Sequence, residues 1–241
     1  MYSIVAENED FVLIDKMPGF SVHKDQEDSG LAMQIKADQG YSELMPVHRL
    51  DKVTSGLMLF ARHHAAASEL SRAFSEHQVE KFYLALSDKK PKKKQGAIVG
   101  DMTRARRGAW RLAKTQIRPA VTQFFSQSLK PGVRLFLLRP LTGKTHQIRV
   151  ALKSVGAPII GDPLYHEKNE TLSDRTYLHA YSLSFPFAGE QYRFTVLPEV
   201  GELFDAECCA LINTHYAQPW TLSWPRIQQH LPNGSDTGSS S

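Results

Sequence analysis

The segment 46–60 places one carboxylate, Asp51, just before a strongly apolar run. Four apolar residues at 57–60 are typical of a buried strand, whereas Thr-Ser-Gly at 54–56 is typical of a turn. The sequence therefore predicts that residues 48–52 form a loop that leads into a core strand. Any fold of this chain must then hold Asp51 beside a rigid element.

Asp51 also lies between two bases, Arg49 and Lys52. A positive charge close by favours the ionised form of a carboxyl group, and an ionised carboxylate suits a nucleophile better than a general acid. A surface loop in which Asp51 only pairs with Lys52 is the alternative. A protein kinase loop is excluded, because Leu50 separates Arg49 from Asp51 and no Gly-x-Gly-x-x-Gly segment precedes it.

Alternating and apolar segments between glycines and prolines predict a largely antiparallel sheet. Strands are predicted at residues 4–5, 11–14, 57–60, 79–86, 97–102, 111–113, 121–125, 133–138, 177–186 and 191–197. Helices are predicted at 30–37 and at 64–77, where Ala66, Leu70 and Phe74 recur at helical spacing and serve packing. We therefore expect an α+β fold with a mixed, mainly antiparallel central sheet and flanking helices.

Basic residues gather in one stretch. Residues 89–118 contain eleven Lys and Arg against one acid, in a chain of 241 residues with a net charge of +4. Such a local positive field suits a phosphate backbone, and the arginines around Trp110 favour nucleic acid, whereas a solvated loop is the alternative.

The sequence Gly-Lys-Thr at 143–145 is not a P-loop, because a P-loop needs a glycine where this chain has Leu138. The pattern instead predicts a helix that starts at Thr142 or Thr145.

Several stretches together resemble the RluA-type pseudouridine synthases. His-Arg-Leu-Asp-Lys-x-Thr-Ser-Gly at 48–56 resembles the active-site motif of that family, and Lys-Phe-Tyr at 81–83 resembles its Lys-x-Tyr. Residues 142–165 resemble a second signature, and Leu-His-Ala-Tyr-x-Leu-Ser-Phe at 178–185 also recurs in the family. The resemblance extends over residues 7–199 in colinear order.

This resemblance implies a pseudouridine synthase fold with a catalytic cleft at its centre. It implies that Asp51 is the catalytic aspartate, that Tyr83 stacks on the target base, and that Arg149 pairs with Asp51. Together with the charge pattern it gives a set of RNA-binding residues: His48, Arg49, Thr54, Lys144, Thr145, His146, Arg104, Arg106 and Arg107. Arg49 is expected to fill the space that the target base leaves.

The expected activity is the isomerisation of a uridine in structured RNA to pseudouridine, without metal, nucleotide or redox cofactor. A non-catalytic RNA-binding or RNA-assembly protein on the same fold is the alternative. A hydrolase would need metal-ligand motifs, which the sequence lacks. The chain departs from the family in Lys-Met-Pro-Gly at 16–19, in Lys144 where arginine is common, and in Ala151 where histidine is frequent.

For domain organisation we expect a catalytic domain at 1–215, an extension at 216–232 that packs on it through Trp220 and Trp224, and a disordered tail at 233–241. Core strands within the first fifteen residues argue against a preceding RNA-binding module. Two adjacent cysteines at 208–209, no apolar run of ~18 residues and no signal peptide predict a cytoplasmic protein. The expected partner is a tRNA or rRNA stem-loop, with tRNA preferred, and we expect a monomer without an obligatory protein partner or membrane contact.

Overall fold

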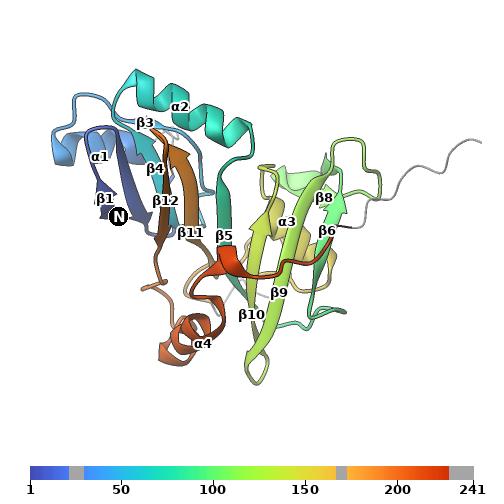
Figure 1. The fold of residues 1–241 in the computed structure, drawn as a ribbon. Coiled ribbons are helices and arrows are strands. Elements are labelled where there is room, and N and C mark those ends of the chain that lie inside the picture. Colours follow the sequence, from blue (N-terminus) through green and yellow to red (C-terminus); the bar gives the residue numbers. More distant parts are fainter. Residues whose placement is uncertain (22–29, 167–172, 228–241) are drawn as a thin grey trace, which may run out of the picture.

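A ten-stranded mixed sheet forms the body of the computed structural model, which describes residues 1–21, 30–166 and 173–227 (Figure 1). Its strands are β1 (Tyr2–Glu7), β2 (Phe11–Lys16), β3 (Met45–Pro46), β4 (Ser55–Ala61), β5 (Glu80–Ser87), β6 (Gln95–Gly100), β9 (Ala120–Lys130), β10 (Val133–Pro140), β11 (Leu178–Phe187) and β12 (Glu190–Thr195). A separate hairpin consists of β7 (Met102–Arg104) and β8 (Trp110–Leu112), joined by the 3₁₀ turn η1 (Arg106–Gly108). The helices are α1 (Leu31–Gln39), α2 (His64–Ser75), α3 (Gln147–Ser154) and α4 (Ala206–Tyr216), followed by the 3₁₀ turn η2 (Pro219–Thr221).

The late strand β11 lies in the middle of this sheet, whose order is β1-β2-β4-β11-β5-β10-β9-β6. It pairs in parallel with β4 and antiparallel with β5. Strand β12 pairs antiparallel with the C-terminal residues of β11, 182–187. The other strand pairs in the described residues are antiparallel. The structure therefore confirms the predicted α+β class and the mixed, mainly antiparallel sheet.

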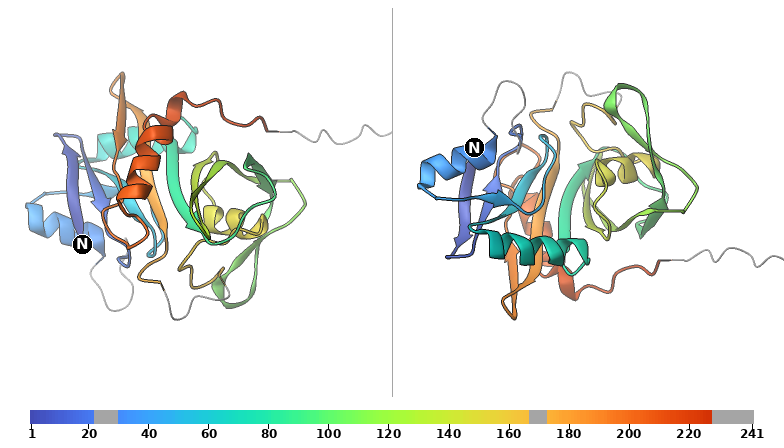
Figure 2. Two further views of the ribbon diagram at one scale, coloured as in Figure 1. Left: turned by 90° about the horizontal axis from the view of Figure 1, so that it is seen from below. Right: turned by 90° about the horizontal axis from the view of Figure 1, so that it is seen from above.

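Both faces of β2 and β4 are covered, which explains why these strands read as continuous apolar runs. One face packs with Ala66 and Leu70 of α2, and the other packs with Leu31 and Ile35 of α1. Figure 2 shows α4 in front in the view from below and α2 in front in the view from above, so these two helices lie at opposite ends of the molecule in the vertical direction of Figure 1. Because both faces of β2 and β4 are packed, these strands hold the loops at their ends in fixed positions.

The other half of the sheet curves around α3. In both views of Figure 2 the strands β6, β9 and β10 surround this helix. Residues 147–152 of α3 are buried, and Ile148 and Leu152 join one apolar cluster with Leu84 of β5 and Phe136 of β10. An arginine in this buried helix can be tolerated only with partners, as the site below shows.

Two local details differ from the sequence predictions. The helix α3 begins at Gln147, and its N-cap is His146 in the left-handed region at φ 55°, so neither Thr142 nor Thr145 caps it. Residues 55 and 56 begin β4 and do not form a turn. Gly56, at φ +109°, lies so close to β11 that an added Cβ would be 2.3 Å from the carbonyl oxygen of Ala180. Strand pairing here has overridden the turn preference of the residues.

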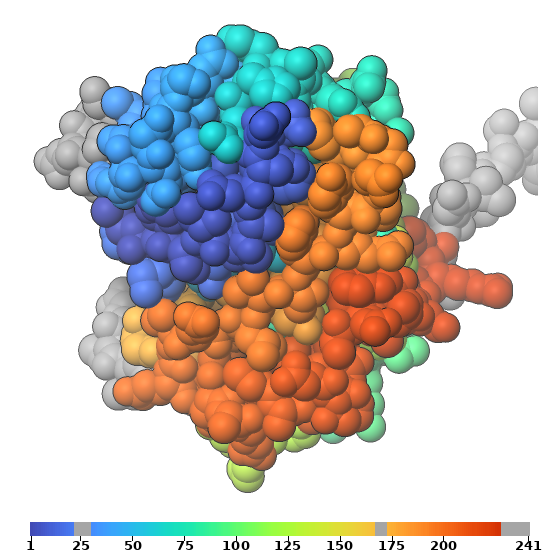
Figure 3. All heavy atoms as spheres, turned by 60° about the vertical axis from the view of Figure 1, so that its left-hand side comes forward, coloured from blue at the N-terminus to red at the C-terminus, as the bar shows by residue number. Residues whose placement is uncertain are grey.

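The first strands and residues 175–200 lie side by side on one face. Figure 3 shows the first residues in blue beside residues 175–200 in orange. Beyond α4, Trp224 stacks on Phe82 at 5.7 Å between ring centroids, and its neighbour Pro225 accepts a hydrogen bond from Gln123. The predicted tail at 233–241 lies outside the described residues. Within the described residues, no helix is both long enough and apolar enough to span a membrane.

Candidate functional site

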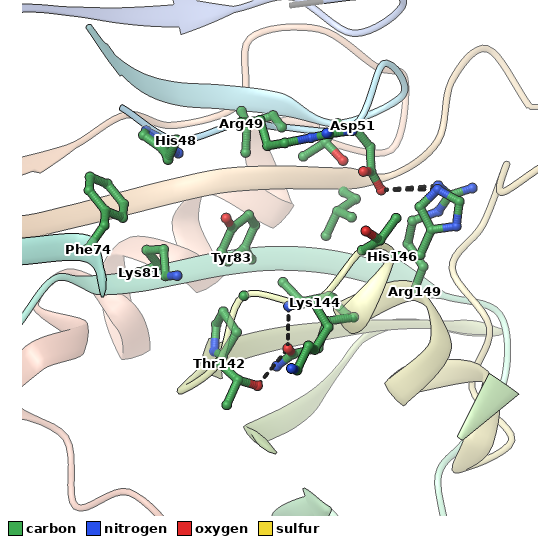
Figure 4. Close-up of a pocket in the computed structure, with 18 of the residues that line it drawn as sticks. His48, Arg49, Asp51, Phe74, Lys81, Tyr83, Thr142, Lys144, His146 and Arg149 are labelled. Carbon is green, nitrogen blue, oxygen red and sulfur yellow. Dashed lines mark hydrogen bonds and ion pairs between the residues drawn. The ribbon is translucent and has the colours of Figure 1, made fainter. Parts of the chain in front are cut away.

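An open pocket of about 450 Å³ lies at the centre of the sheet, between the loop before β4, the start of β5 and the loop before α3. This is within the range of ligand pockets in proteins. The pocket brings together residues that the sequence analysis selected from three separate segments: His48, Arg49, Asp51, Thr54, Tyr83, Lys144, Thr145, His146 and Arg149 (Figure 4). The predicted Arg104, Arg106 and Arg107 do not line it.

Asp51 contacts Arg149 across the pocket. The Oδ2 atom of Asp51 accepts a hydrogen bond from Nη1 of Arg149 at 3.1 Å (Figure 4). The Asp51 side chain is 22% exposed and that of Arg149 only 4%. Within residues 1–21, 30–166 and 173–227, Oδ1 of Asp51 accepts no hydrogen bond, so this oxygen is available to a ligand. The alternative raised from the sequence, in which Asp51 pairs with Lys52, is not seen among the described residues, because the carboxylate points to α3.

Arg149 is oriented by a second carboxylate that the sequence analysis did not identify. Asp162, which is fully buried, accepts from Nε of Arg149 at 2.8 Å and from Nη2 at 2.9 Å. Burial disfavours the charge of Arg149, but the hydrogen bonds and charges of Asp162 and Asp51 together outweigh this effect, and the pKa of Arg149 lies above its ordinary value. Asp162 is also held by the backbone N–H groups of Leu164 and Tyr165. The guanidinium therefore reaches Asp51 from a fixed position.

The Asp51 loop is anchored by two side chains, the buried Lys16 and the half-buried His48. Lys16 donates to the carbonyl oxygens of Met17, Phe20 and Lys52 at 3.0 to 3.3 Å, and burial lowers the pKa of Lys16 to about 7. His48 accepts from the backbone N–H of Leu59 at 2.9 Å. The bond to the carbonyl of Lys52 ties the residue after Asp51 to the end of β2, and the bond from Leu59 ties His48 to β4.

His48 also stacks on Phe74 of α2, with ring centroids 4.7 Å apart. Burial, and to a smaller extent the charge of Lys81, lowers the pKa of His48 to about 3, so the ring is neutral at pH 7. A neutral ring that already accepts a backbone hydrogen bond positions its loop and is not a cation for phosphate. Phe74 itself lines the pocket, so α2 does more than pack on the sheet.

Tyr83 lies on β5 in the pocket wall, half-buried. Burial and the nearby charge of Asp51 raise the pKa of its phenol above the ordinary range, so Tyr83 keeps its proton at neutral pH. In the described part of the chain its hydroxyl has no hydrogen-bond partner. The ring and the hydroxyl are both available to a substrate in the pocket.

Lys81, two residues earlier on β5, was not among the predicted site residues, although it stands in the Lys-x-Tyr motif. It lines the pocket, and burial lowers its pKa. Its ammonium lies 5.9 Å from the ring of Phe74. The alternation of residues along the strand could have revealed it, because residues two apart share one face.

The loop before α3 is fixed by the buried amide of Gln147. Its Oε1 accepts from Oγ1 of Thr142 at 2.7 Å and from the N–H of Lys144 at 3.0 Å, and its Nε2 donates to β9 (Figure 4). Lys144 and Thr145 are exposed at the rim of the pocket. Arg49 is exposed on the opposite rim.

The basic stretch divides into two parts. Arg104, Arg106 and Arg107 are exposed on the β7–β8 hairpin, which contacts α3 and so adjoins the pocket. The lysines at 89–94 follow the end of β5 that is remote from Lys81. Among the described residues, no group of three or more His, Cys, Asp or Glu is placed to hold a metal ion.

Similar proteins cover most of this chain. The family described as RNA pseudouridylate synthase matches residues 10–154. An uncharacterized RNA pseudouridine synthase of Haemophilus influenzae is 51% identical over 201 residues, which are 83% of this chain and 89% of that protein. The dual-specificity RNA pseudouridine synthase RluA of Pasteurella multocida is 34% identical over 81% of this chain and 92% of its own. The solved structure of human RNA pseudouridylate synthase domain containing 1 has a TM-score of 0.72 at 27% identity, and the match covers 86% of this chain and 87% of that chain.

Proposed function

Since the chain belongs to the RNA pseudouridylate synthase family and is an isomerase that acts on RNA, we propose that Asp51, Tyr83 and Arg149 carry out the reaction in the central pocket. The reaction breaks the bond between N1 of uracil and C1′ of the ribose, rotates the base, and joins C5 to C1′. The C5 proton is lost and N1 gains a proton, so atoms and electrons balance without a redox cofactor.

Each of the three residues has a role that its surroundings support. The free Oδ1 of Asp51 is the reacting oxygen, either on the sugar or on the uracil ring. Tyr83 stacks on the base and, as a neutral phenol, is available for hydrogen bonding near C5. Arg49, exposed at the rim, occupies the space of the extruded base.

One observation carries this assignment. Arg149 is held by Asp162 through two of its nitrogens and presents the third to Asp51. A fixed guanidinium stabilises the carboxylate and turns its other oxygen towards the pocket. A protein that only bound RNA would not need a buried arginine, Arg149, to orient the partly exposed carboxylate of Asp51.

The substitution Asp51→Asn tests the assignment. It keeps the shape of the side chain and removes its charge, so we expect pseudouridine formation to fall by about a thousandfold or more while RNA affinity stays within about twofold. Tritium release from C5-labelled uridine in RNA and filter binding measure the two quantities. Turnover comparable to that of the wild-type enzyme would refute the assignment.

We propose that the β7–β8 hairpin, with Arg104, Arg106 and Arg107, supplies the main phosphate contacts beside the pocket. It adjoins α3, whereas the lysines at 89–94 lie at the remote end of β5. Each phosphate contact contributes about 0.9 to the salt slope on duplex RNA. Replacing the three arginines by Ala should flatten the slope by about 2 to 3, and the matched Lys92, Lys93 and Lys94 to Ala variant should change it by less than about 1. Equal effects of both variants would contradict this division.

As substrate we propose a transfer RNA or a small stem-loop in preference to a large ribosomal site. A basic hairpin beside the central pocket offers a compact footprint, which suits a compact RNA. The Pasteurella relative is named a dual-specificity enzyme, so its name favours neither choice. Mapping pseudouridines in cells with and without this protein identifies the target, and a loss confined to ribosomal RNA would overturn the choice without affecting the isomerase assignment.

We also propose that the protein works in the cytoplasm as a monomer without an obligatory protein partner. The unpaired Cys208 and Cys209 on α4 support a reducing compartment. Light scattering of the purified protein and cell fractionation test both statements, and a stable dimer or an exported protein would contradict them.

A further inference from the structure

A chain of polar contacts connects the basic hairpin to the carboxylate of Asp51. The backbone N–H of Trp110 on β8 donates to the hydroxyl of Tyr165 at 2.9 Å. The same hydroxyl lies 2.8 Å from Nδ1 of His146, and Nε2 of His146 lies 3.9 Å from Oδ2 of Asp51. The side chain of Tyr165 therefore lies between the hairpin and the pocket.

The direction of these hydrogen bonds follows from the Trp110 donor together with the negative charge of Asp51. The amide of Trp110 can only donate, so the oxygen of Tyr165 accepts there and has its own hydrogen for Nδ1 of His146. Nδ1 is then an acceptor, and the neutral ring carries its hydrogen on Nε2, which faces Asp51. The opposite tautomer would turn a lone pair towards the carboxylate.

Other charges around His146 support a neutral ring. Burial and the charge of Arg149 lower its pKa, against the opposite effects of Asp51 and Asp162, and Arg49 adds to the lowering. The backbone of His146 is left-handed at φ 55°, which is unusual for a residue other than glycine and is maintained by its surroundings. The ring of Tyr165 also lies 5.1 Å from the guanidinium carbon of Arg149. Tyr165 therefore touches both groups that approach Oδ2 of Asp51.

We infer that Tyr165 is a positioning residue for the reaction: its hydroxyl, held by the hairpin, fixes His146 with Nε2–H towards Asp51 and links the seating of RNA on the hairpin to the orientation of the catalytic carboxylate. The inference rests on the proposed function of Asp51. With Arg149 and His146 both on the side of Oδ2, Oδ1 stays directed into the pocket. RNA bound to the hairpin acts on this contact, because the Trp110 amide belongs to the hairpin.

The substitution Tyr165→Phe removes only the hydroxyl and keeps the ring under Arg149. We expect kcat for pseudouridine formation to fall by about tenfold, with KM for RNA within about twofold, because the contact orients Asp51 and does not bind RNA. Tyr181→Phe is the matched control: it removes a buried hydroxyl that donates to the carbonyl of Tyr216, remote from the pocket. The control should leave kcat unchanged. Circular dichroism melting curves of both variants show whether either has lost its fold.

His146 variants show whether Tyr165 acts through His146. His146→Gln keeps an N–H at the reach of Nε2 and should retain several times the kcat of His146→Ala. If Tyr165 acts through His146, then Tyr165→Phe should lower the kcat of His146→Ala no further, so the double-mutant cycle is non-additive. A folded Tyr165→Phe variant with wild-type kcat, or fully additive losses, would overturn the inference. Either result would leave the loss of activity in Asp51→Asn intact, so it would not touch the proposed function.

Discussion

Asp51 and Asp162 contact the same guanidinium, and yet their surroundings are opposite. Asp162 is fully buried and accepts two hydrogen bonds from Arg149 and two from backbone N–H groups. Asp51 is 22% exposed, accepts one hydrogen bond from Arg149, and keeps Oδ1 free in the described structure. Both oxygens of Asp162 accept hydrogen bonds that hold the structure together. Only one oxygen of Asp51 does so in the described part of the chain, and the other is available to a substrate.

This difference shows how one arginine can serve a reactive group without losing its own place. A buried charge is stable only if its partners are fixed, and the four hydrogen bonds of Asp162 provide that. Asp51 can then react, rotate or change its charge during turnover while the guanidinium remains where it is. Substitutions of Asp162, of the turn that holds it, of the Asp51 loop and of Arg149 test this difference between the two carboxylates.

The largest effect is expected for Asp162→Asn. Removal of the buried carboxylate leaves Arg149 with the partly exposed Asp51 as its remaining anionic partner in the described residues, so the free energy of unfolding should fall by about 3 to 5 kcal/mol. Asp51→Asn, exposed at the pocket, should cost less than about 1 kcal/mol. Urea unfolding followed by circular dichroism measures both. Similar losses in the two variants would contradict the distinction.

The turn that holds Asp162 should be nearly as sensitive. A Cβ added to Gly161, at φ +73°, would lie 1.9 Å from the carbonyl oxygen of Arg175, whereas Gly156, at φ +77°, has nothing within 4 Å. Both substitutions to Ala carry the strain of a positive φ, about 1 kcal/mol, and Gly161→Ala should lose roughly 2 kcal/mol more from the clash. Thermal unfolding of the pair separates the two effects, and equal melting temperatures would show that the turn yields.

The anchor of the Asp51 loop should make stability depend on pH. Burial lowers the pKa of His48 from 6.5 to about 3, so its contribution is complete above pH 6.5 and is lost as the pH falls towards 3. At pH 5 this loss is about 2 kcal/mol for one histidine. His48→Gln keeps an acceptor for the N–H of Leu59 but cannot titrate, so the fall in melting temperature between pH 7 and pH 5 should be smaller in this variant.

His179 provides the comparison for His48, because burial lowers its pKa to about 3 as well and it remains in the variant. Asp15 acts in the opposite sense, since burial raises its pKa to about 6 and it stabilises the fold as the pH falls. An unchanged pH dependence in His48→Gln would show that His48 is not buried neutral in the folded protein.

The smallest effect is expected for Arg149→Lys. An ammonium group keeps the charge but cannot present three nitrogens in fixed directions to Asp162 and Asp51. We expect kcat to fall by about tenfold, equivalent to about 1.4 kcal/mol, with the fold retained. Single-turnover kinetics and melting curves check both expectations. A variant with full activity would show that the charge alone suffices.

The sequence allowed most of the sheet to be predicted, and the motifs identified the residues that meet in the pocket. Strands such as β4 and β10 are continuous apolar runs, so local pattern and final structure agree. Asp162 was missed because its partner is thirteen residues away and the pairing depends on how α3 is buried. Its place after a glycine and before a proline was the available signal, since such turns often bury an Asx side chain.

The failures at His146 and Gly56 have a common physical cause. Local preference placed the start of α3 at a threonine, but the amide of Gln147 recruits Thr142 into the loop and leaves His146 as the cap. Local preference also placed a turn at 54–56, but pairing with β11 extends β4 over these residues. Contacts between distant segments decided both, and a single sequence does not display them.

The position of β11 in the sheet has a consequence for how the enzyme folds during its synthesis on the ribosome. Strand β11 lies between β4 and β5 and connects them in the sheet. It is synthesised more than ninety residues after Tyr83 of β5. Until then each has an open edge that can pair with another chain, and closure demands contacts far apart in the sequence, which slows folding. We therefore expect nascent chains that stop before residue 178 to be aggregation-prone and to need chaperones. The chain can modify RNA only after its last central strand has joined the two halves.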